Sequence, residues 1–124
     1  MAKIGITILG MKEVSKMLKD NAKEAMNRVD TGVTKAVFFV EGEVKQSISG
    51  NRDEHMSVDT GRFLNSVKGT KTKKMEGKVE SNVKYGPILE HGSSSRTGRH
   101  HFGNTATRNT NKVKKIIAKE VNKI

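Results

Sequence analysis

Helical periodicity over residues 11–49 is the strongest constraint on the fold of this chain. Apolar residues recur every three or four positions from Met11 to Ile48, without a proline, and on a helical wheel they form one continuous stripe. An unbroken helix over this segment would be about 60 Å long, whereas a compact chain of this size has a radius of gyration of about 14 Å. The sequence therefore predicts a helix that breaks, bends or projects. The predicted break is Asp30-Thr31-Gly32, where Asp30 or Thr31 can cap a second segment, and Gly42 is a second weak point.

Shorter patterns predict three strands. Residues 4–8 alternate with period two, which predicts a strand that ends at Gly10. Residues 63–71 and 77–83 predict two further strands, joined by a charged hairpin turn over residues 73–77.

Two helices complete the predicted fold. Residues 83–91 predict a short helix that ends at Gly92, the residue type that best tolerates the left-handed position after a helix. A final helix is predicted from residue 104 or 105 to residue 123. The predicted fold class is therefore α+β, with an antiparallel β-sheet packed against the long N-terminal helix, the short middle helix and the C-terminal helix. The apolar residues on one face of the short helix are expected in the core: Tyr85, Ile88 and Leu89.

Composition bounds the domain organisation. With 33% apolar and only 4% aromatic residues the core is expected to be thin, and the chain has no cysteine to form a disulfide or a thiolate metal site. We expect a single domain over residues 1–124, with a flexible loop at about residues 92–104 that becomes ordered on contact with another surface. No apolar run reaches the roughly 20 residues that span a membrane, and the N-terminus lacks the apolar region of a signal peptide. We therefore expect a soluble protein made in the cytoplasm.

The formal net charge of +11 is concentrated near the end of the chain, because residues 93–124 alone carry a net +7. Such a basic segment predicts an acidic partner, either nucleic acid or an acidic protein surface, although lysines on a solvated helix face give the same composition. Arg96, Arg99 and Arg108 could reach phosphates, so a small basic protein with non-specific nucleic-acid binding is the alternative function. Tyr85 and Phe102 are the only aromatic residues near them, which is poor support for base stacking.

Phe38 does not fit the apolar stripe of the long helix, since it lies roughly opposite to it on the wheel. A phenylalanine there needs a second apolar neighbour, which is either another part of the same fold or a neighbouring subunit. Phe38 is therefore a candidate interface residue.

Residues suited to catalysis are scarce. His91, His100 and His101 form the only histidine cluster, without the cysteine or carboxylate partners at helical spacing that zinc sites use. Glu90-His91 is followed by three serines, but no nucleophile elbow surrounds them, and no phosphate-binding loop sequence is present. We expect no enzymatic activity, no cofactor and no metal. An enzyme of the toxin or nuclease type would need these histidines to gather with a carboxylate in one pocket.

Three segments follow one another in a fixed order: residues 59–67 (DTGRFLNSV), residues 85–92 (YGPILEHG) and residues 101–106 (HFGNTA). Together they resemble the head–tail joining proteins of long-tailed bacteriophages, the neck or tail-completion group. In that group a Thr-Gly-x-Leu-type segment enters a β-hairpin, a Tyr-Ala-x-x-(Leu/Val)-Glu-x-Gly helix follows, and a Pro-Phe-Leu-Arg-Pro-Ala stretch opens the terminal helix. The third segment departs most, since only Phe102 and Ala106 of that stretch remain. The motif positions in this chain are Thr60, Gly61, Leu64, Ser66, Tyr85, Leu89, Glu90 and Gly92.

The resemblance implies a structural virion protein without enzymatic activity, located in the neck at the head–tail interface. Such proteins form a ring, commonly six-fold, between the capsid connector and the tail, and the DNA passes through it. The implied partners are other copies of the chain, a head-closure or connector protein, and a tail terminator or tube protein, with non-specific contact to the passing DNA and no membrane. We expect Phe102 to anchor the loop over residues 92–104 on a neighbouring subunit or ring. The candidate interface residues are Phe38, Arg96, Arg99, His100, His101 and Phe102.

Overall fold

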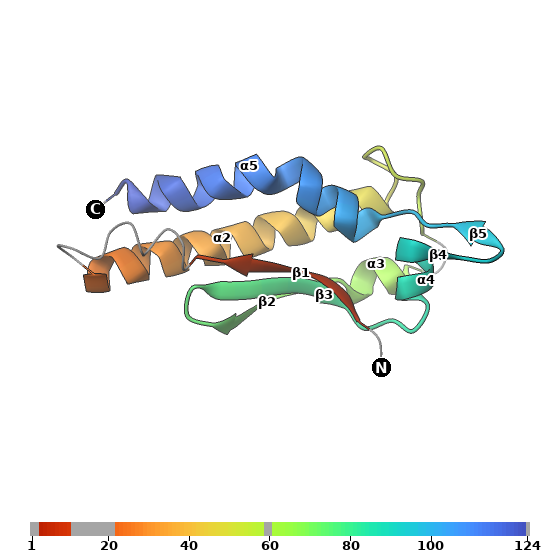
Figure 1. Cartoon of the computed structure of the whole chain (residues 1–124), viewed down its shortest axis with the longest axis horizontal. Coiled ribbons are helices and arrows are strands. Elements are labelled where there is room, and N and C mark those ends of the chain that lie inside the picture. The colour runs from red at the N-terminus through yellow and green to blue at the C-terminus, as the bar shows by residue number, and fades with distance from the viewer. Residues whose placement is uncertain (1–2, 11–21, 59–60, 124) are drawn as a thin grey trace.

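A computed structural model describes residues 3–10, 22–58 and 61–123 of the chain. Two long helices and a three-stranded sheet run side by side along the long axis of an elongated molecule (Figure 1). The α+β fold class predicted from the sequence is confirmed. In chain order the elements are β1 (Ile4–Leu9), α2 (Ala22–Ile48), α3 (Arg62–Ser66), β2 (Lys68–Lys73), β3 (Glu76–Ser81), α4 (Gly86–His91), β4 (Gly92–Ser93), β5 (Arg96–Thr97) and α5 (His101–Val121).

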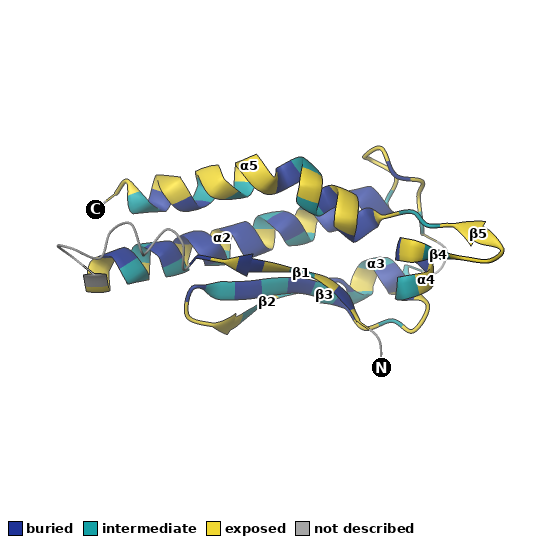
Figure 2. Ribbon diagram, in the orientation of Figure 1, coloured by how far each residue is buried: buried dark blue, intermediate teal, exposed yellow. Residues whose placement is uncertain are grey.

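Helix α2 lies between α5 on one side and the sheet on the other (Figure 1). The sheet is antiparallel in the order β1-β3-β2, so that Ile6 pairs with Val79 and Val79 with Gly69. Because α2 is covered on two sides, its buried face is broad, and the dark-blue positions run along its whole length (Figure 2). The centre of the core is built on α2 from Val29, Val33, Ala36, Val37, Val40, Val44 and Ile48, all at most 2% exposed.

The predicted break in the long helix at Asp30-Thr31-Gly32 is wrong, because α2 is continuous from Ala22 to Ile48. The prediction assumed a compact globule, whereas an elongated molecule accommodates a helix of this length. The Asp30 carboxylate caps no helix and instead accepts hydrogen bonds from the Met75 backbone N–H, at 2.7 Å, and from Lys71. The predicted helix over residues 11–21 lies outside the described residues.

Gly32 serves helix packing and marks no break. A Cβ atom at this position would lie 2.9 Å from the Cα atom of Ile117, so the missing side chain allows α5 to approach the backbone of α2. On the opposite side of α2, Cβ atoms at Gly69 and Gly77 would each lie 2.5 Å from a methyl group of Val37. One glycine on α2 and two in the sheet therefore set how closely the three layers pack.

The strand predicted to begin at Phe63 starts five residues later. Residues 62–66 form the short helix α3, and β2 begins at Lys68. Gly61 has a φ of 81°, a left-handed conformation that suits glycine, and it turns the chain into α3. Phe63 and Val67 are both buried while Asn65 is exposed, which is the four-residue spacing of a helical turn rather than the alternation of a strand. The rest of the predicted hairpin is confirmed, with its turn at Lys74 and Met75.

The polar stretch over residues 92–104 is shorter as a loop than the sequence suggested. Strands β4 and β5 pair as a tight antiparallel hairpin, and α5 already begins at His101 instead of at residue 104 or 105. The short helix α4 ends where it was predicted to, with Gly92 at a φ of 86°. Among the described residues, no helix is long and apolar enough to cross a membrane.

The two glycines of α2 predict opposite effects of one substitution. We expect Gly32→Ala to lower the free energy of unfolding by about 1–3 kcal/mol, because the new methyl group overlaps the backbone of α5. Gly42→Ala is the matched control on the same helix. No atom lies within 4 Å of its Cβ position, so the better helix propensity of alanine should raise stability by up to about 1 kcal/mol. Urea unfolding followed by circular dichroism measures both, and equal effects of the two substitutions would contradict this role of Gly32.

Candidate interaction site at the α3–α4 end

The motif segments of the sequence meet at one end of the molecule. Helices α3 and α4, the hairpin β4–β5 and the first turn of α5 gather there, at the right-hand end of Figure 1. Of the motif positions, Thr60 lies outside the described residues. Gly61, Leu64 and Ser66 belong to the turn into α3 and to α3 itself, and the Ser66 hydroxyl donates to the carbonyl oxygen of Phe63 at 2.6 Å and lies 2.6 Å from the Ser81 hydroxyl.

Glu90 caps the N-terminus of α5 from the end of α4. Its two carboxylate oxygens accept hydrogen bonds from the backbone N–H groups of Phe102 and Gly103, each at 2.8 Å. Its carbonyl oxygen accepts a further bond from the His100 N–H at 3.1 Å. The residue before α5, His100, has a φ of 56° and offers no side-chain cap of its own. A buried carboxylate therefore satisfies the free N–H groups at the positive end of α5.

Two candidate interface residues, His101 and Phe102, lie inside the chain. Phe102 is 3% exposed and belongs to the hydrophobic core, and His101 has no exposed surface. The expectation that Phe102 reaches a neighbouring subunit is therefore wrong for this structure, because Glu90 pulls the start of α5 onto the core. The prediction that three residues of the short helix lie in the core is correct only for Leu89, which is buried. Tyr85 is 39% and Ile88 46% exposed.

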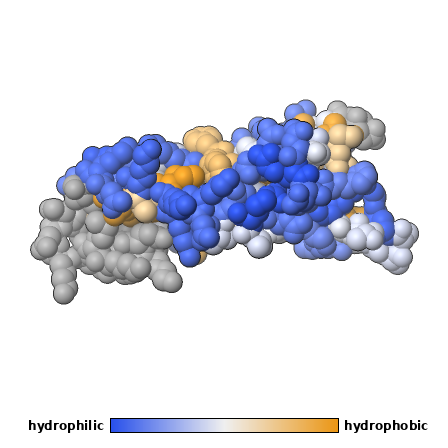
Figure 3. All heavy atoms as spheres, turned by 90° about the horizontal axis from the view of Figure 1, so that it is seen from above, coloured by the Kyte–Doolittle hydropathy of each residue, from blue (hydrophilic) through white to orange (hydrophobic). Residues whose placement is uncertain are grey.

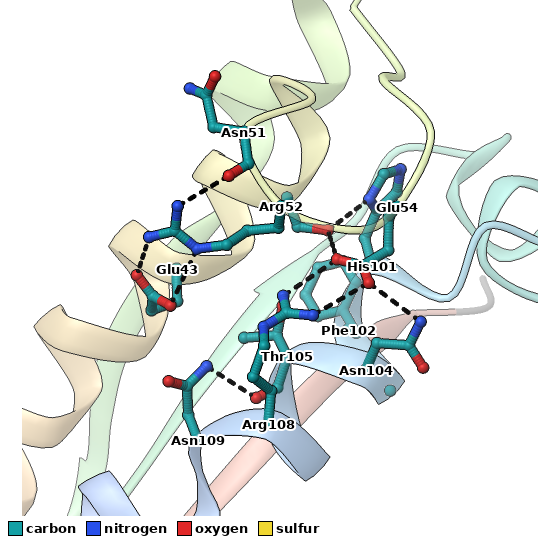
Figure 4. Close-up of polar contacts among 12 residues, drawn as sticks. Glu43, Asn51, Arg52, Glu54, His101, Phe102, Asn104, Thr105, Arg108 and Asn109 are labelled. Atoms are coloured by element: carbon teal, nitrogen blue, oxygen red, sulfur yellow. Dashed lines mark hydrogen bonds and ion pairs between the residues drawn. The ribbon is translucent and has the colours of Figure 1, made fainter.

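His101 takes part in a chain of hydrogen bonds, and Figure 4 shows its ring close to Glu54 and Arg108. The Ser47 hydroxyl donates to Glu54 Oε1 at 2.5 Å, so it accepts from His101 Nδ1–H at 2.8 Å. His101 Nε2 then accepts from the Ser57 hydroxyl at 2.7 Å, and Ser57 accepts from Arg99 Nη1 at 2.7 Å. The bond from Ser47 to Glu54 places a proton on His101 Nδ1, and the burial of the ring favours the neutral imidazole, in which Nε2 is the acceptor.

Glu54 closes the other end of this network. The guanidinium of Arg108 donates to both carboxylate oxygens at 3.0 Å, and Asn104 Nδ2 donates to Oε2 at 3.1 Å. Burial by itself raises the pKa of Glu54, but the hydrogen bonds from Arg108, Ser47 and Asn104 outweigh it and lower the pKa to about 2. Burial lowers the pKa of His101 below its ordinary value, and the nearby carboxylates of Glu90 and Glu54 offset this only in part. The network ties the end of α2 and residues 54–57 to the first turns of α5.

Sequence reasoning missed Ser47, Glu54 and Ser57, because each is a polar residue in or beside a segment that reads as a loop. Arg108, predicted to reach phosphates, is engaged by Glu54 instead. The three histidines of the possible metal cluster have different surroundings: His91 is exposed beside β4, His100 is exposed before α5, and His101 is buried. Within the described parts of the chain, no group of three histidine or carboxylate side chains is placed to hold a metal ion.

The remaining interface candidates are at the surface. Arg96 and His100 are exposed and Arg99 is half-buried at this end of the molecule, and Phe38 is 64% exposed on α2. Arg96, Arg99 and Tyr85 line a pocket of about 710 Å³ together with residues 55–58 and the start of α3. The hydrogen bonds of Arg99 to Met56 and Ser57 hold three of the pocket-lining residues together.

Comparison with protein families gives a match over two thirds of the chain. The model of a family described as "Bacteriophage HK97-gp10, putative tail-component" matches residues 10–92, from the end of β1 to the end of α4. This family fits the resemblance to head–tail joining proteins of long-tailed phages, and a family of structural tail components points away from an enzymatic role. Comparisons with curated proteins and with solved structures found no significant match.

The cap on α5 predicts the effect of Glu90→Gln. An amide at this position turns one of the two acceptors into a donor that faces a backbone N–H group, so we expect a loss of about 1–3 kcal/mol in the free energy of unfolding. Faster hydrogen exchange at the amides of Phe102 and Gly103 should accompany the loss. The exposed Glu24 on α2 supplies the control, since Glu24→Gln should change stability by less than about 0.5 kcal/mol. Unchanged exchange at both amides would show that Glu90 is not the cap.

The buried neutral His101 predicts a loss of stability in mild acid. Because its pKa is lowered in the folded state, the unfolded chain takes up a proton first as the pH falls below about 6.5. Stability should therefore fall between pH 6.5 and the lowered pKa, with a slope of up to about 1.4 kcal/mol per pH unit. Urea unfolding at pH 7.5, 6 and 5 measures this slope, and Glu54 adds only a small part to it, since its carboxyl in the unfolded chain binds protons mainly near pH 4.5.

Two variants distinguish the contribution of His101 to the pH dependence of stability from that of other groups. His101→Gln should flatten the slope between pH 6.5 and 5, whatever its stability at pH 7.5, whereas His100→Gln, at an exposed position outside the network, should leave the slope in place. A full slope in His101→Gln would mean that another group causes the pH dependence.

Proposed function

The chain belongs to the HK97-gp10-like family of bacteriophage tail components, and from this premise we propose that it is a structural protein of the virion neck. Residues 1–124 act as one connector-type domain. Copies of the chain form a ring, six-fold in this proposal, that joins the head-closure or connector protein to the tail terminator or tube protein. The DNA passes through the ring.

The main support for the proposed ring is a stripe of exposed residues on α2 with Phe38 in its middle. The exposed positions of α2 between its two covered sides recur at helical spacing: Thr31, Lys35, Phe38, Gly42 and Gln46. Gly42 has open space around it, so the helix surface beside the Phe38 ring is bare. A large aromatic side chain on a bare helix surface is the kind of anchor that subunit interfaces bury.

A groove on a different face of the chain can receive such an anchor. It has a volume of about 440 Å³ and runs between β1 and α5, with Ile6, Leu9 and Val113 among its lining residues. Strand β1 is an edge of the sheet, so this groove is open along the molecule. Because Phe38 and the groove are different surfaces, the contact between them repeats head to tail, which is the arrangement that closes a ring.

The exposed lysines of α5 support the non-specific DNA contact. Seen from the α5 side, the surface is mostly hydrophilic and its hydrophobic patches are small (Figure 3). The lysines of this face are exposed and carry much of the +7 of the C-terminal segment: Lys112, Lys114, Lys115 and Lys119. A face of this kind contacts phosphates without reading sequence, as the inner wall of a DNA channel requires.

Phe38→Asp tests the ring in assembling particles that lack the native chain. We expect filled heads and finished tails that stay separate, with joined particles reduced at least about tenfold, because a carboxylate cannot be buried in an apolar contact. Electron microscopy of the particles counts joined and separate structures.

The control variant is Thr107→Asp, the same new charge at an exposed position on α5. It should join heads and tails at the native rate. Thermal unfolding of both purified variants checks that the substitutions leave the fold intact. Normal joining in a folded Phe38→Asp variant would rule out this contact.

A further inference from the structure

Arginines line the pocket at the α3–α4 end. Its lining includes Arg96 and Arg99, and no carboxylate is found among its described lining residues. At about 710 Å³ it is large enough for two or three side chains of another molecule. We refer to it as the arginine pocket.

Two of its arginines are available for a partner. Arg99 Nη1 donates to the Met56 carbonyl oxygen and to the Ser57 hydroxyl, both at 2.7 Å, and these bonds hold the guanidinium at the pocket wall. Arg96 stands exposed on β5. Over the described ranges, neither of these two guanidinium groups forms an ion pair with a carboxylate of the chain. A guanidinium held by neutral groups keeps its full charge for an anion.

The pocket is also apolar on one side. Met56 is 51%, Val58 37% and Tyr85 39% exposed, although each lines the pocket. The Tyr85 ring rests edge-on against the buried ring of Phe63, with centroids 6.1 Å apart, so it is fixed in position. An occupant is therefore expected to bring both an anionic group and an apolar side chain.

Among the described residues, a second copy of the chain offers few carboxylates that are not already paired. Most of its described carboxylates already bind a lysine, an arginine or a helix end within the same chain, and the formal net charge is +11. The engaged side chains are Asp30, Glu41, Glu43, Glu54, Glu76, Glu80, Glu90 and Glu120. The charge balance therefore favours an acidic partner of a different kind.

We propose that the arginine pocket binds an acidic segment of another protein. Carboxylates of that segment pair with Arg96 and Arg99, and an apolar side chain beside them packs on Met56 and Tyr85. A concave site lined by apolar as well as charged side chains suits a protein side chain better than the phosphate backbone of a DNA duplex, which offers charge alone. That the partner is a component of the same particle rests on the proposed function, whereas the chemistry of the pocket does not.

Binding of two peptides to the isolated chain tests the pocket without requiring a ring. The probe is a fluorescent peptide in which glutamate alternates with leucine, and its matched control has glutamine in place of every glutamate. We expect fluorescence anisotropy to show binding of the acidic peptide, at least about tenfold weaker binding of the glutamine peptide, and a similar loss in Arg96→Glu. Met56→Ser should weaken binding a few fold, since it removes apolar contact only.

Lys115→Glu makes the same change of net charge on the exposed face of α5. This substitution should weaken binding of the acidic peptide by less than about threefold, because salt screens the effect of a distant charge. Equal losses in Arg96→Glu and Lys115→Glu, or equal binding of the two peptides, would overturn the proposal. A third result would also overturn the proposal: an oligonucleotide displaces the peptide, and Arg96→Glu selectively weakens binding of that oligonucleotide. The pocket would then be a nucleic-acid site.

A photo-crosslinking residue in place of Met56 identifies the occupant in assembled particles. The expected product is a different virion protein, crosslinked within a segment rich in aspartate and glutamate by mass spectrometry. Crosslinks to a second copy of this chain or to DNA would contradict the assignment. Because the peptide measurement uses the isolated chain, a failure of ring formation leaves its result intact, and the two proposals fail separately.

Discussion

The fold depends on the burial of one helix from two sides. Helix α2 has a broad apolar face that neither α5 nor the sheet can cover alone. Both approach it closely because glycines occupy positions where side chains would separate the layers: Gly32 on α2 faces α5, and Gly69 and Gly77 in the sheet face α2. In a chain with only 4% aromatic residues, close packing of small side chains replaces the volume that large ones supply elsewhere. The same arrangement leaves one stripe of α2 uncovered, and Phe38 lies in it.

The far end of the molecule is organised by polar groups in addition to the core residues Phe63, Leu89 and Phe102. Glu90 links the end of α4 to the start of α5, and the network from Arg99 through His101 to Glu54 and Arg108 links that start to the end of α2. Both carboxylate oxygens of Glu54 and of Glu90 are paired, and paired polar groups are the condition under which such a network stabilises a structure. These contacts place Tyr85, Arg96 and Arg99 around one pocket although they come from different elements.

The two kinds of charge differ in how far they are engaged within the chain. The carboxylates of the described chain are mostly engaged in internal contacts, whereas many arginines and lysines remain at the surface. A protein of net charge +11 with its anions engaged internally repels its own copies at long range and attracts acidic surfaces and nucleic acid. Apolar contacts, such as the one proposed for Phe38, are therefore the natural means of self-association, and the arginines are left for partners of opposite charge.

The sequence by itself determined the fold class, the order of the main elements, the β-hairpin and the family, because period, turn residues and motif order are local properties of the chain. It also identified Phe38 as a residue without a place in the core, and Glu90 as a motif position without a role. Tertiary structure decided that α2 continues through Gly32, since only the approach of α5 explains that glycine. It also decided that Phe63 begins a helical turn and that Phe102 and His101 are buried, because Glu90 draws the start of α5 onto the core. Ser47, Glu54, Ser57 and Arg108 acquire partners far away in the chain, and no local pattern encodes contacts of that kind.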